Sequence, residues 1–251
     1  MTAPIDALRG SVAHLHTTVE GLTPDQITGP AYPSEWTVAD ALSHIGSGAV
    51  ILNRWLDDTI TGAPTPDDFA PAVWDVWNGK DAQDQAADAL AADRALLDAL
   101  EAVSANDRDT FTFSFGPRSF DFDGFVGLRL NEHALHTWDV EVAARPDAPV
   151  NADAVPVVID QLAMIVGFTG KPDGPERQVA VRTTDPERNL SLDFGAESVS
   201  LTPSEPVDAP DLELAAEAFI RLIYGRLDAD HTPTVTGPAD LDALRAAFPG
   251  A

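Results

Sequence analysis

The stretch from Arg129 to Asp139 reads Arg-Leu-Asn-Glu-His-Ala-Leu-His-Thr-Trp-Asp and lies inside a segment with helical spacing of its apolar residues. That segment covers about residues 123–144. In three earlier segments, apolar residues also recur every three or four positions, as on one face of a helix; these segments cover about residues 4–21, 37–58 and 81–103. Four helices of this length predict a four-helix bundle around one core.

The pattern changes after this last helix. Residues 145–151 (RPDAPVN) are polar and contain two prolines, so the helix should end near Ala144. We place the domain boundary there, dividing residues 1–146 from residues 147–251. The second part combines expected helices with short alternating segments and predicts a small α+β domain with an antiparallel sheet. Its expected helices are 155–168, 212–224 and 240–247, and its expected strands are 178–183, 189–194, 198–202 and 231–237. Between the third and fourth helices, residues 110–116 alternate and predict a short strand or extended loop.

Composition excludes several function classes. The chain has 251 residues, with 15 Lys and Arg against 41 Asp and Glu, which gives a net charge of −26. Such an acidic surface repels phosphate groups, so we expect binding neither to nucleic acid nor to a membrane surface. Hydrophobic residues make up 44% of the chain, which is enough for a folded core. Cysteine is absent, so any thiol chemistry must use a thiol from outside the chain.

The sequence also suggests where the protein resides. Residues 1–8 lack a basic region followed by an apolar run, so we expect no signal peptide. The chain contains no stretch of 18 apolar residues, so we expect no membrane-spanning segment. Lysine occurs only at Lys80 and Lys171, a bias typical of a GC-rich genome such as that of an actinomycete. We expect a cytoplasmic protein that is a monomer or a small homo-oligomer.

The histidines suggest a metal site. Glu132 and His136 are four residues apart and share a face of the fourth helix, which we expect to point towards the bundle interior. Burying a carboxylate there costs several kcal/mol unless it is paired or metal-bound. With His44 on the second helix, they form a donor set suited to zinc, iron or nickel with open positions. His133 and His16 remain alternative ligands, and ordinary packing of Glu132 and His136 remains the alternative without a metal.

Two motifs resemble a known family. Residues 35–45 (EWTVADALSHI) resemble the W-T-V-x-D-L-x-x-H-L signature of the DinB-like superfamily, and residues 132–140 (EHALHTWDV) are similar to the E-x-x-x-H-x-W-D segment of the mycothiol-dependent maleylpyruvate isomerase family. The resemblance implies a divalent metal, usually zinc, held by His44, Glu132 and His136. It also implies a C-terminal domain similar to sterol-carrier proteins. Arg226, in a Gly-Arg pair that follows a helix, would help to hold an anionic substrate; a helix C-cap is the alternative role for this pair.

The implied activity is thiol chemistry. A metal ion lowers the pKa of a bound thiol, which makes it a nucleophile near neutral pH. The resemblance implies mycothiol as that thiol, an electrophilic small molecule as its partner, and cis–trans isomerisation or thiol transfer as the outcome. Two alternatives stay open: a metal-dependent hydrolase that uses metal-bound water, and a non-catalytic protein that binds a small ligand.

Several neighbouring residues have more than one interpretation. Asp139 and Asp40 could each orient a ligand imidazole, but we expect them to be solvated carboxylates on a very acidic surface. We expect Trp36 and Trp138 to be core anchors rather than platforms for a substrate. Trp74 and Trp77, before the third helix, are also expected in the core, with the mouth of a pocket as the alternative. Positively charged residues are scarce, and Arg54, Arg94 and Arg129 could each bind an anionic ligand. A salt bridge to one of the many carboxylates is the default expectation for all three.

Overall fold

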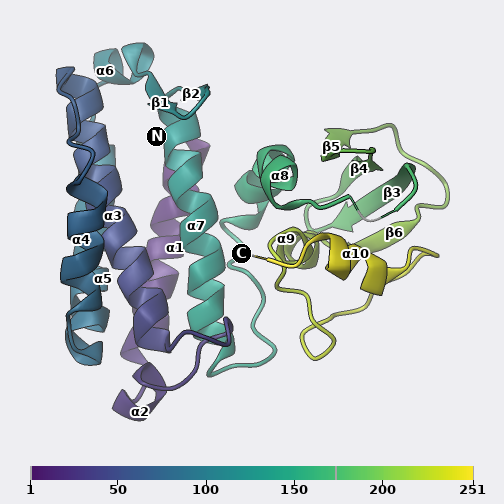
Figure 1. The fold of residues 1–251 in the computed structure, drawn as a ribbon, viewed down its shortest axis with the longest axis horizontal. Helices are drawn as coiled ribbons and strands as arrows, with labels where there is room; N and C mark the ends of the chain where they lie inside the picture. Colours follow the sequence, from purple (N-terminus) through teal and green to yellow (C-terminus); the bar gives the residue numbers. More distant parts are fainter. Residues whose placement is uncertain (1, 173, 251) are drawn as a thin grey trace. The chain divides into compact units, whose positions relative to one another are not determined.

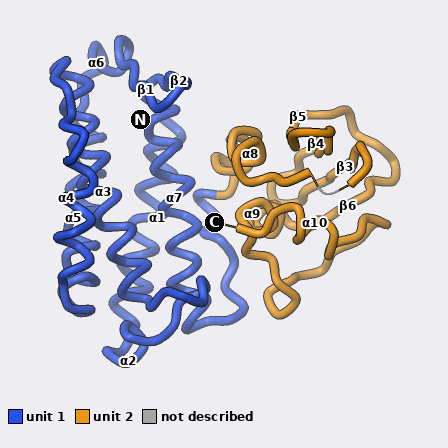
Figure 2. Tube along the Cα trace, viewed as in Figure 1, with its two compact units in different colours: residues 1–154 blue, residues 155–251 orange. Residues whose placement is uncertain are grey.

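The computed structural model describes residues 2–172 and 174–250. The chain forms two compact units, one ending at Ala154 and one beginning at Val155 (Figure 2). The expected boundary at residue 146 falls in the segment between the last helix of the first unit and this division. Within the described residues, no helix is both long enough and apolar enough to cross a membrane.

Four long helices dominate the first unit (Figure 1). They are α1 (Ala3–Glu20), α3 (Val38–Thr61), α5 (Ala82–Ala102) and α7 (Phe122–Val142). Helices α1 and α3 each pack against both α5 and α7. Each of the four overlaps a segment that the apolar periodicity predicts to be helical. The contact between α3 and α7 is the one that positions the candidate site.

Side-chain caps explain where these helices begin. The Thr37 hydroxyl accepts a hydrogen bond from the Asp40 backbone N–H, and the Asp40 carboxylate accepts one from Thr37 N–H, which completes a capping box. Asp81 and Asp121 cap α5 and α7 without a capping box, because only their side chains accept hydrogen bonds from backbone N–H groups of the first turn. Helix α3 ends at Gly62, whose φ of 71° is a left-handed conformation that glycine adopts without strain.

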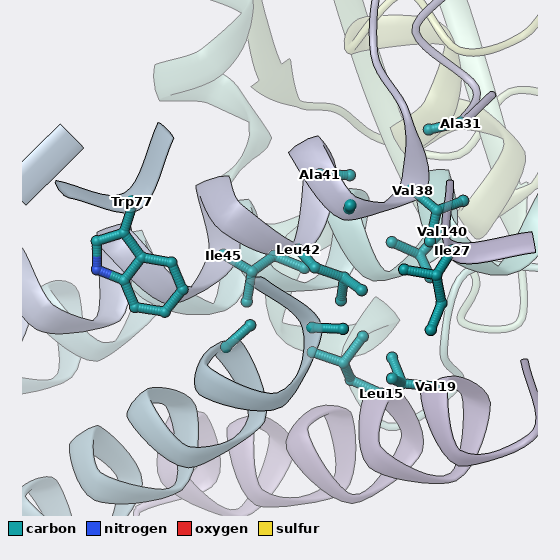
Figure 3. Close-up of a cluster of buried hydrophobic side chains, with 13 residues drawn as sticks. Leu15, Val19, Ile27, Ala31, Val38, Ala41, Leu42, Ile45, Trp77 and Val140 are labelled. Carbon is teal, nitrogen blue, oxygen red and sulfur yellow. The ribbon is translucent and has the colours of Figure 1, made fainter. Parts of the chain in front are cut away.

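One cluster of buried apolar side chains joins α1, α3 and α5 (Figure 3). Leu15 and Leu42 are fully buried at its centre, and the ring of Trp77 closes one side. Trp77 comes from α4 (Phe69–Asn78), a short helix outside the four long ones. The expectation of core packing is confirmed for Trp77 and wrong for Trp74, which is 48% exposed. Both lie on α4, and only the α4 face that packs on α3 is covered.

Short elements of the first unit depart from the expectation. Residues 110–116 are not one extended segment, because Thr110 ends helix α6 (Ala105–Thr110). Ser104 caps that helix, and the local cap outweighs the alternating pattern. The strand β1 (Phe113–Phe115) is confined to the second half and pairs with β2 (Arg118–Phe120). Helices α2 (Pro24–Ile27) and α4 were not predicted, because they are too short for a clear periodic signal.

The second unit contains a mixed four-stranded sheet with helices. Its strand order is β5-β4-β3-β6, and β6 runs parallel to β3 while the other pairs are antiparallel. The purely antiparallel sheet was therefore a wrong expectation. The elements are α8 (Val155–Thr169), β3 (Arg177–Thr184), β4 (Arg188–Phe194), β5 (Val199–Pro203), β6 (Leu212–Ala215), α9 (Ala216–Ile223) and α10 (Leu241–Ala247).

Two further expectations for this unit were wrong. The helix expected over residues 212–224 begins only at Ala216, because Leu212 and Leu214 bury alternate positions as strand β6 beside β3. Residues 231–237 form no strand, and only Thr236 makes an isolated bridge, to Glu213. Both errors have one cause, since strand pairing depends on a distant partner that local propensity does not reveal.

Candidate metal centre

Three side chains from two helices converge in the first unit. His44 comes from α3, and Glu132 and His136 come from α7. A carboxylate oxygen of Glu132 lies 3.5 Å from His44 Nε2 and 3.6 Å from His136 Nε2. One donor atom from each residue lies within 4.8 Å of the other two. Among the described residues, this is the group of His, Asp and Glu side chains whose geometry could hold a metal ion.

The donor set fits a divalent metal. Zinc binds imidazole nitrogen and carboxylate oxygen at about 2.0–2.1 Å, which places neighbouring donors of a tetrahedral site about 3.3 Å apart. The two Glu132 distances are within a few tenths of an ångström of that spacing. Two neutral imidazoles and one carboxylate are also a common three-ligand set for catalytic zinc, which keeps its fourth position open.

The site is open to solvent. The exposed fractions of the Glu132 and His44 side chains are 51% and 42%, and that of His136 is 12%. The expectation that Glu132 points into the bundle interior was therefore wrong. A helical wheel assigns residues to a face but cannot tell whether a neighbouring helix covers that face. The exposure leaves room for a ligand beside the three donor atoms.

Asp139 supports the site from the interior. Its carboxylate is fully buried and accepts a hydrogen bond of 2.8 Å from His136 Nδ1. The expectation of a solvated carboxylate was wrong for this residue, because α7 turns Asp139 inward one turn after His136. Asp40 has a different role, since it completes the capping box of α3 and does not contact His44 through any observed hydrogen bond.

The electrostatics of the three donors are coupled. The surrounding protein removes part of the water from Glu132, which would raise its pKa, but hydrogen bonds with His136 and His44 outweigh this effect and hold that pKa below its ordinary value. Burial would lower the pKa of His136, but its hydrogen bonds with Asp139 and Glu132 raise it. Glu132 is therefore ionised near neutral pH, as a metal ligand must be.

An aromatic wall adjoins both imidazoles. The ring of Trp36 stacks on His136 with 5.6 Å between centroids and an interplanar angle of 23°. The same ring lies 5.4 Å from His44 at 45°. Trp36 is partly exposed and packs against the edge of the buried apolar cluster, so the expectation of a core anchor is confirmed only in part. Trp138, in contrast, is buried as expected.

The alternative ligands lie elsewhere. His133 is fully buried and hydrogen-bonds through Nε2 to Asp93 at 2.8 Å and through Nδ1 to Ser11 at 2.8 Å. His16 lies on α1, and its Nε2 is buried without a hydrogen-bond partner among the described residues. Neither belongs to the group that could hold a metal. Arg226 lies in the second unit, where its Nη1 donates to the Tyr224 carbonyl oxygen at 2.8 Å.

A buried ion pair near the candidate centre confirms the salt bridge expected by default for Arg129, while its partner Asp93 was not predicted. Arg129 Nη2 lies 2.7 Å from Asp93 Oδ1, and both side chains are at most 2% exposed. Asp93 also binds His133, so it joins α5 to α7. Burial lowers the pKa of His133, which favours the neutral ring. The only sequence signal was a polar residue among apolar ones on the inner side of α5.

One known family matches the part of the chain that carries the candidate centre. The profile of the mycothiol maleylpyruvate isomerase N-terminal domain matches residues 8–141, more than half of the chain and all three candidate ligands. The chain belongs to this family. Among curated proteins, the chain is similar to an uncharacterized protein from two strains of Mycobacterium tuberculosis. It is 27% identical over 146 residues, which cover 58% of this chain and 68% of the relative.

Solved structures resemble this chain over nearly its whole length, and so beyond the matched N-terminal domain. Two crystal structures of the mycothiol-dependent maleylpyruvate isomerase, one of them a histidine-to-alanine variant, match with TM-scores of 0.64 and 0.65. Each match covers 94% of this chain and 93% of the other. The sequences are only 14% and 15% identical, so the likeness establishes the fold and leaves the activity to be argued from the site.

Proposed function

We propose that this protein is a metal-dependent enzyme of mycothiol chemistry that isomerises, or joins to the thiol, a small electrophilic substrate. The observation that carries the proposal is the convergence of His44, Glu132 and His136 on one solvent-open point. Membership of the mycothiol maleylpyruvate isomerase family supports the choice of thiol. The absence of cysteine agrees with it, because the chain has no sulfur nucleophile of its own.

The protein's own residues hold and orient the centre. His44 and His136 would bind Zn²⁺, or another divalent metal, through Nε2, and Glu132 would bind it through a carboxylate oxygen. The hydrogen bond to Asp139 occupies Nδ1 of His136 and so directs Nε2 towards the centre. When bound, the metal lowers the pKa of a coordinated thiol so that the thiolate forms near neutral pH.

The reaction then follows from thiolate chemistry. The thiolate forms a carbon–sulfur bond to one carbon of a cis double bond, and the electron pair moves onto the activated neighbouring carbon. Rotation about the resulting single bond and expulsion of the thiolate give the trans isomer and return the thiol. A transferase would instead protonate the intermediate and release the conjugate. We propose Arg226 as the group that helps to hold the anionic substrate.

Metal content tests the first step of the proposal. The purified protein should contain about one zinc or similar ion per chain, and His44→Ala should lose it. His231→Ala is the matched control, because His231 pairs with Asp228 in the second unit. A wild-type protein that takes up no divalent metal, even when it is supplied in excess, would overturn the proposal.

Product analysis tests the second step. The zinc-loaded protein should convert maleylpyruvate, or a related electrophile, only in the presence of mycothiol. Thiol recovered unchanged indicates isomerisation, and thiol consumed in equal amount indicates transfer. Hydrolysis of an ester or amide without added thiol would contradict the proposal and favour metal-bound water as the nucleophile.

A further inference from the structure

Arg129 is a buried cation with unused hydrogen-bond donors. Its side chain is 2% exposed, and it lies on α7 one turn before Glu132. Nη2 donates to Asp93 at 2.7 Å and to the carbonyl oxygen of Ile45 at 3.1 Å. Among the described residues, Nε is buried without a partner, and no hydrogen bond forms at Nη1. Three of the five N–H groups of this guanidinium are therefore without a protein acceptor.

Such a deficit is unusual for a purely structural ion pair. Buried polar groups are nearly always hydrogen-bonded, and a group that is not calls for an explanation such as a missing ligand. Asp93 accepts from Arg129 only at Nη2, and its second oxygen accepts from His133. The unused donors are thus free to meet an acceptor that is not part of the chain.

Gly48 leaves Arg129 accessible on the side of the metal centre. Gly48 follows His44 by one turn of α3, about 6 Å along the helix axis, and it is partly exposed. A Cβ atom at this position would lie 3.3 Å from Arg129 Nη1. Because glycine has no side chain, Gly48 itself places no side-chain atom over Nη1. The hydrogen bond from Arg129 to Ile45, the residue after His44, ties the guanidinium to this same turn.

We infer that Arg129 Nη1, reached past Gly48, binds a carboxylate group of the substrate beside the metal centre. This inference rests on the proposed function and adds Arg129 to it as a residue that positions the substrate through its carboxylate. A guanidinium suits this role because it keeps its charge at any physiological pH and matches the geometry of a carboxylate. The separation of about 6 Å between the turns of His44 and Gly48 suits an acid whose reacting carbon is a few bonds from its carboxylate.

Positively charged side chains are scarce in this chain, so the position of Arg129 beside the candidate centre is informative about the ligand. Only 15 of the 251 residues are Lys or Arg, against 41 Asp and Glu, so an anionic ligand meets a repulsive surface almost everywhere. Asp93 already pairs with Arg129 through Nη2, and Glu132 belongs to the candidate metal donors. The N–H groups at Nη1 are what Arg129 still offers to a ligand, and an anionic acceptor fits them.

The test is Gly48→Ala, which covers Nη1 with a methyl group and leaves the pair of Arg129 and Asp93 in place. Alanine favours a helix over glycine, so this variant should fold. Calorimetry on the zinc-loaded protein measures the Kd of maleate, a small unsaturated dicarboxylate, and of its uncharged dimethyl ester. We expect the Kd of maleate to rise about ten- to hundredfold, as for the loss of a charge-assisted hydrogen bond. The Kd of the ester and the zinc content should not change.

Two further variants complete the experiment. Arg129→Lys keeps the charge next to Asp93 but loses the planar donor group, and it should weaken maleate binding without loss of zinc. Gly167→Ala adds a methyl group to α8 where nothing lies within 4 Å, and it should bind maleate as the wild type does.

The outcomes separate this inference from the proposed function. Unchanged maleate affinity in both Gly48→Ala and Arg129→Lys, or no maleate binding by the wild type, would overturn the inference and leave Arg129 as a structural ion pair. Failure to bind zinc would overturn the proposed function alone. Maleate binding by the metal-free protein that is lost in Gly48→Ala would still support the anion site.

Discussion

His136 Nδ1 donates a 2.8 Å hydrogen bond to the carboxylate of Asp139, which is fully buried one turn further along α7. The bond fixes the rotation of the imidazole and leaves Nε2 to face Glu132 and His44. In metal sites, a carboxylate behind a ligand histidine fixes its tautomer and raises its basicity. This hydrogen bond distinguishes Asp139 from Asp40, which lies close to His44 in the sequence but caps α3.

Asp139→Asn should weaken zinc binding about 10- to 100-fold while the helices remain intact. The amide keeps the shape of the side chain but removes the charge that stabilises the liganded ring. Competition with a chromophoric chelator measures the affinity, and circular dichroism measures the fold. Asp40→Asn is the control, because Asp40 caps α3 and has no observed contact with a ligand histidine. Equal losses of affinity in the two variants would contradict the assigned role.

Trp36 should report on metal binding, because its ring lies 5.4 and 5.6 Å from the rings of His44 and His136. Titration with Co²⁺, whose absorption makes it a quencher, should reduce tryptophan emission in the wild type. Trp36→Phe should remove most of this change. Trp74→Phe should keep it, because Trp74 lies exposed on α4, outside the contacts of the metal centre. Quenching that persists in Trp36→Phe would place the metal elsewhere.

Because of Asp93, the free energy of unfolding should depend on pH in the acidic range. Burial opposes its ionisation, but His133 and Arg129 outweigh burial and hold the pKa of Asp93 well below its ordinary value. A carboxyl whose folded pKa is depressed stabilises the protein above its unfolded pKa of about 3.9, and that stability is lost as the pH falls below it. The free energy of unfolding in urea should therefore fall steeply between pH 5 and pH 2.

Asp93→Asn provides the comparison for this acid effect. It should be less stable than the wild type by about 3–5 kcal/mol at neutral pH, because Arg129 stays buried without its counter-charge. Its further loss between pH 5 and pH 2 should be smaller by about 1.4 kcal/mol or more, the equivalent of one pKa unit. Parallel pH profiles of the two proteins would show that Asp93 does not carry the effect.

Gly46→Ala should destabilise the first unit by about 1–3 kcal/mol through overpacking. The added Cβ would collide with the ring of Trp77 and lie 2.8 Å from the Cα of Ala89. This cost exceeds the gain of about 1 kcal/mol from helix propensity. Thermal unfolding measures the effect, and Gly167→Ala, which meets open space, should be neutral or slightly stabilising. A stabilised Gly46→Ala variant would mean that α3 and α5 can separate without cost.

Helix positions were the most predictable part of the fold. Apolar spacing and the caps at Thr37, Asp81 and Asp121 act over a few residues, so the sequence predicts α3, α5 and α7 closely. Strand β6 was missed because Leu212–Ala215 has a pattern that fits a helix or a strand. Only the pairing with β3, about 30 residues earlier in the chain, selects the strand.

The sequence alone determined that Glu132 and His136 share a helix face, because the helix period fixes residues four apart. It also determined His44 as their companion, through the family motif rather than through spacing. The tertiary structure decided the rest: that Glu132 is open to solvent, that Asp139 is buried behind His136, and that Arg129 meets Asp93 beneath Gly48. The contact between His44 and Glu132 joins residues 88 positions apart, and the geometry of the whole site depends on how α3, α5 and α7 pack against one another.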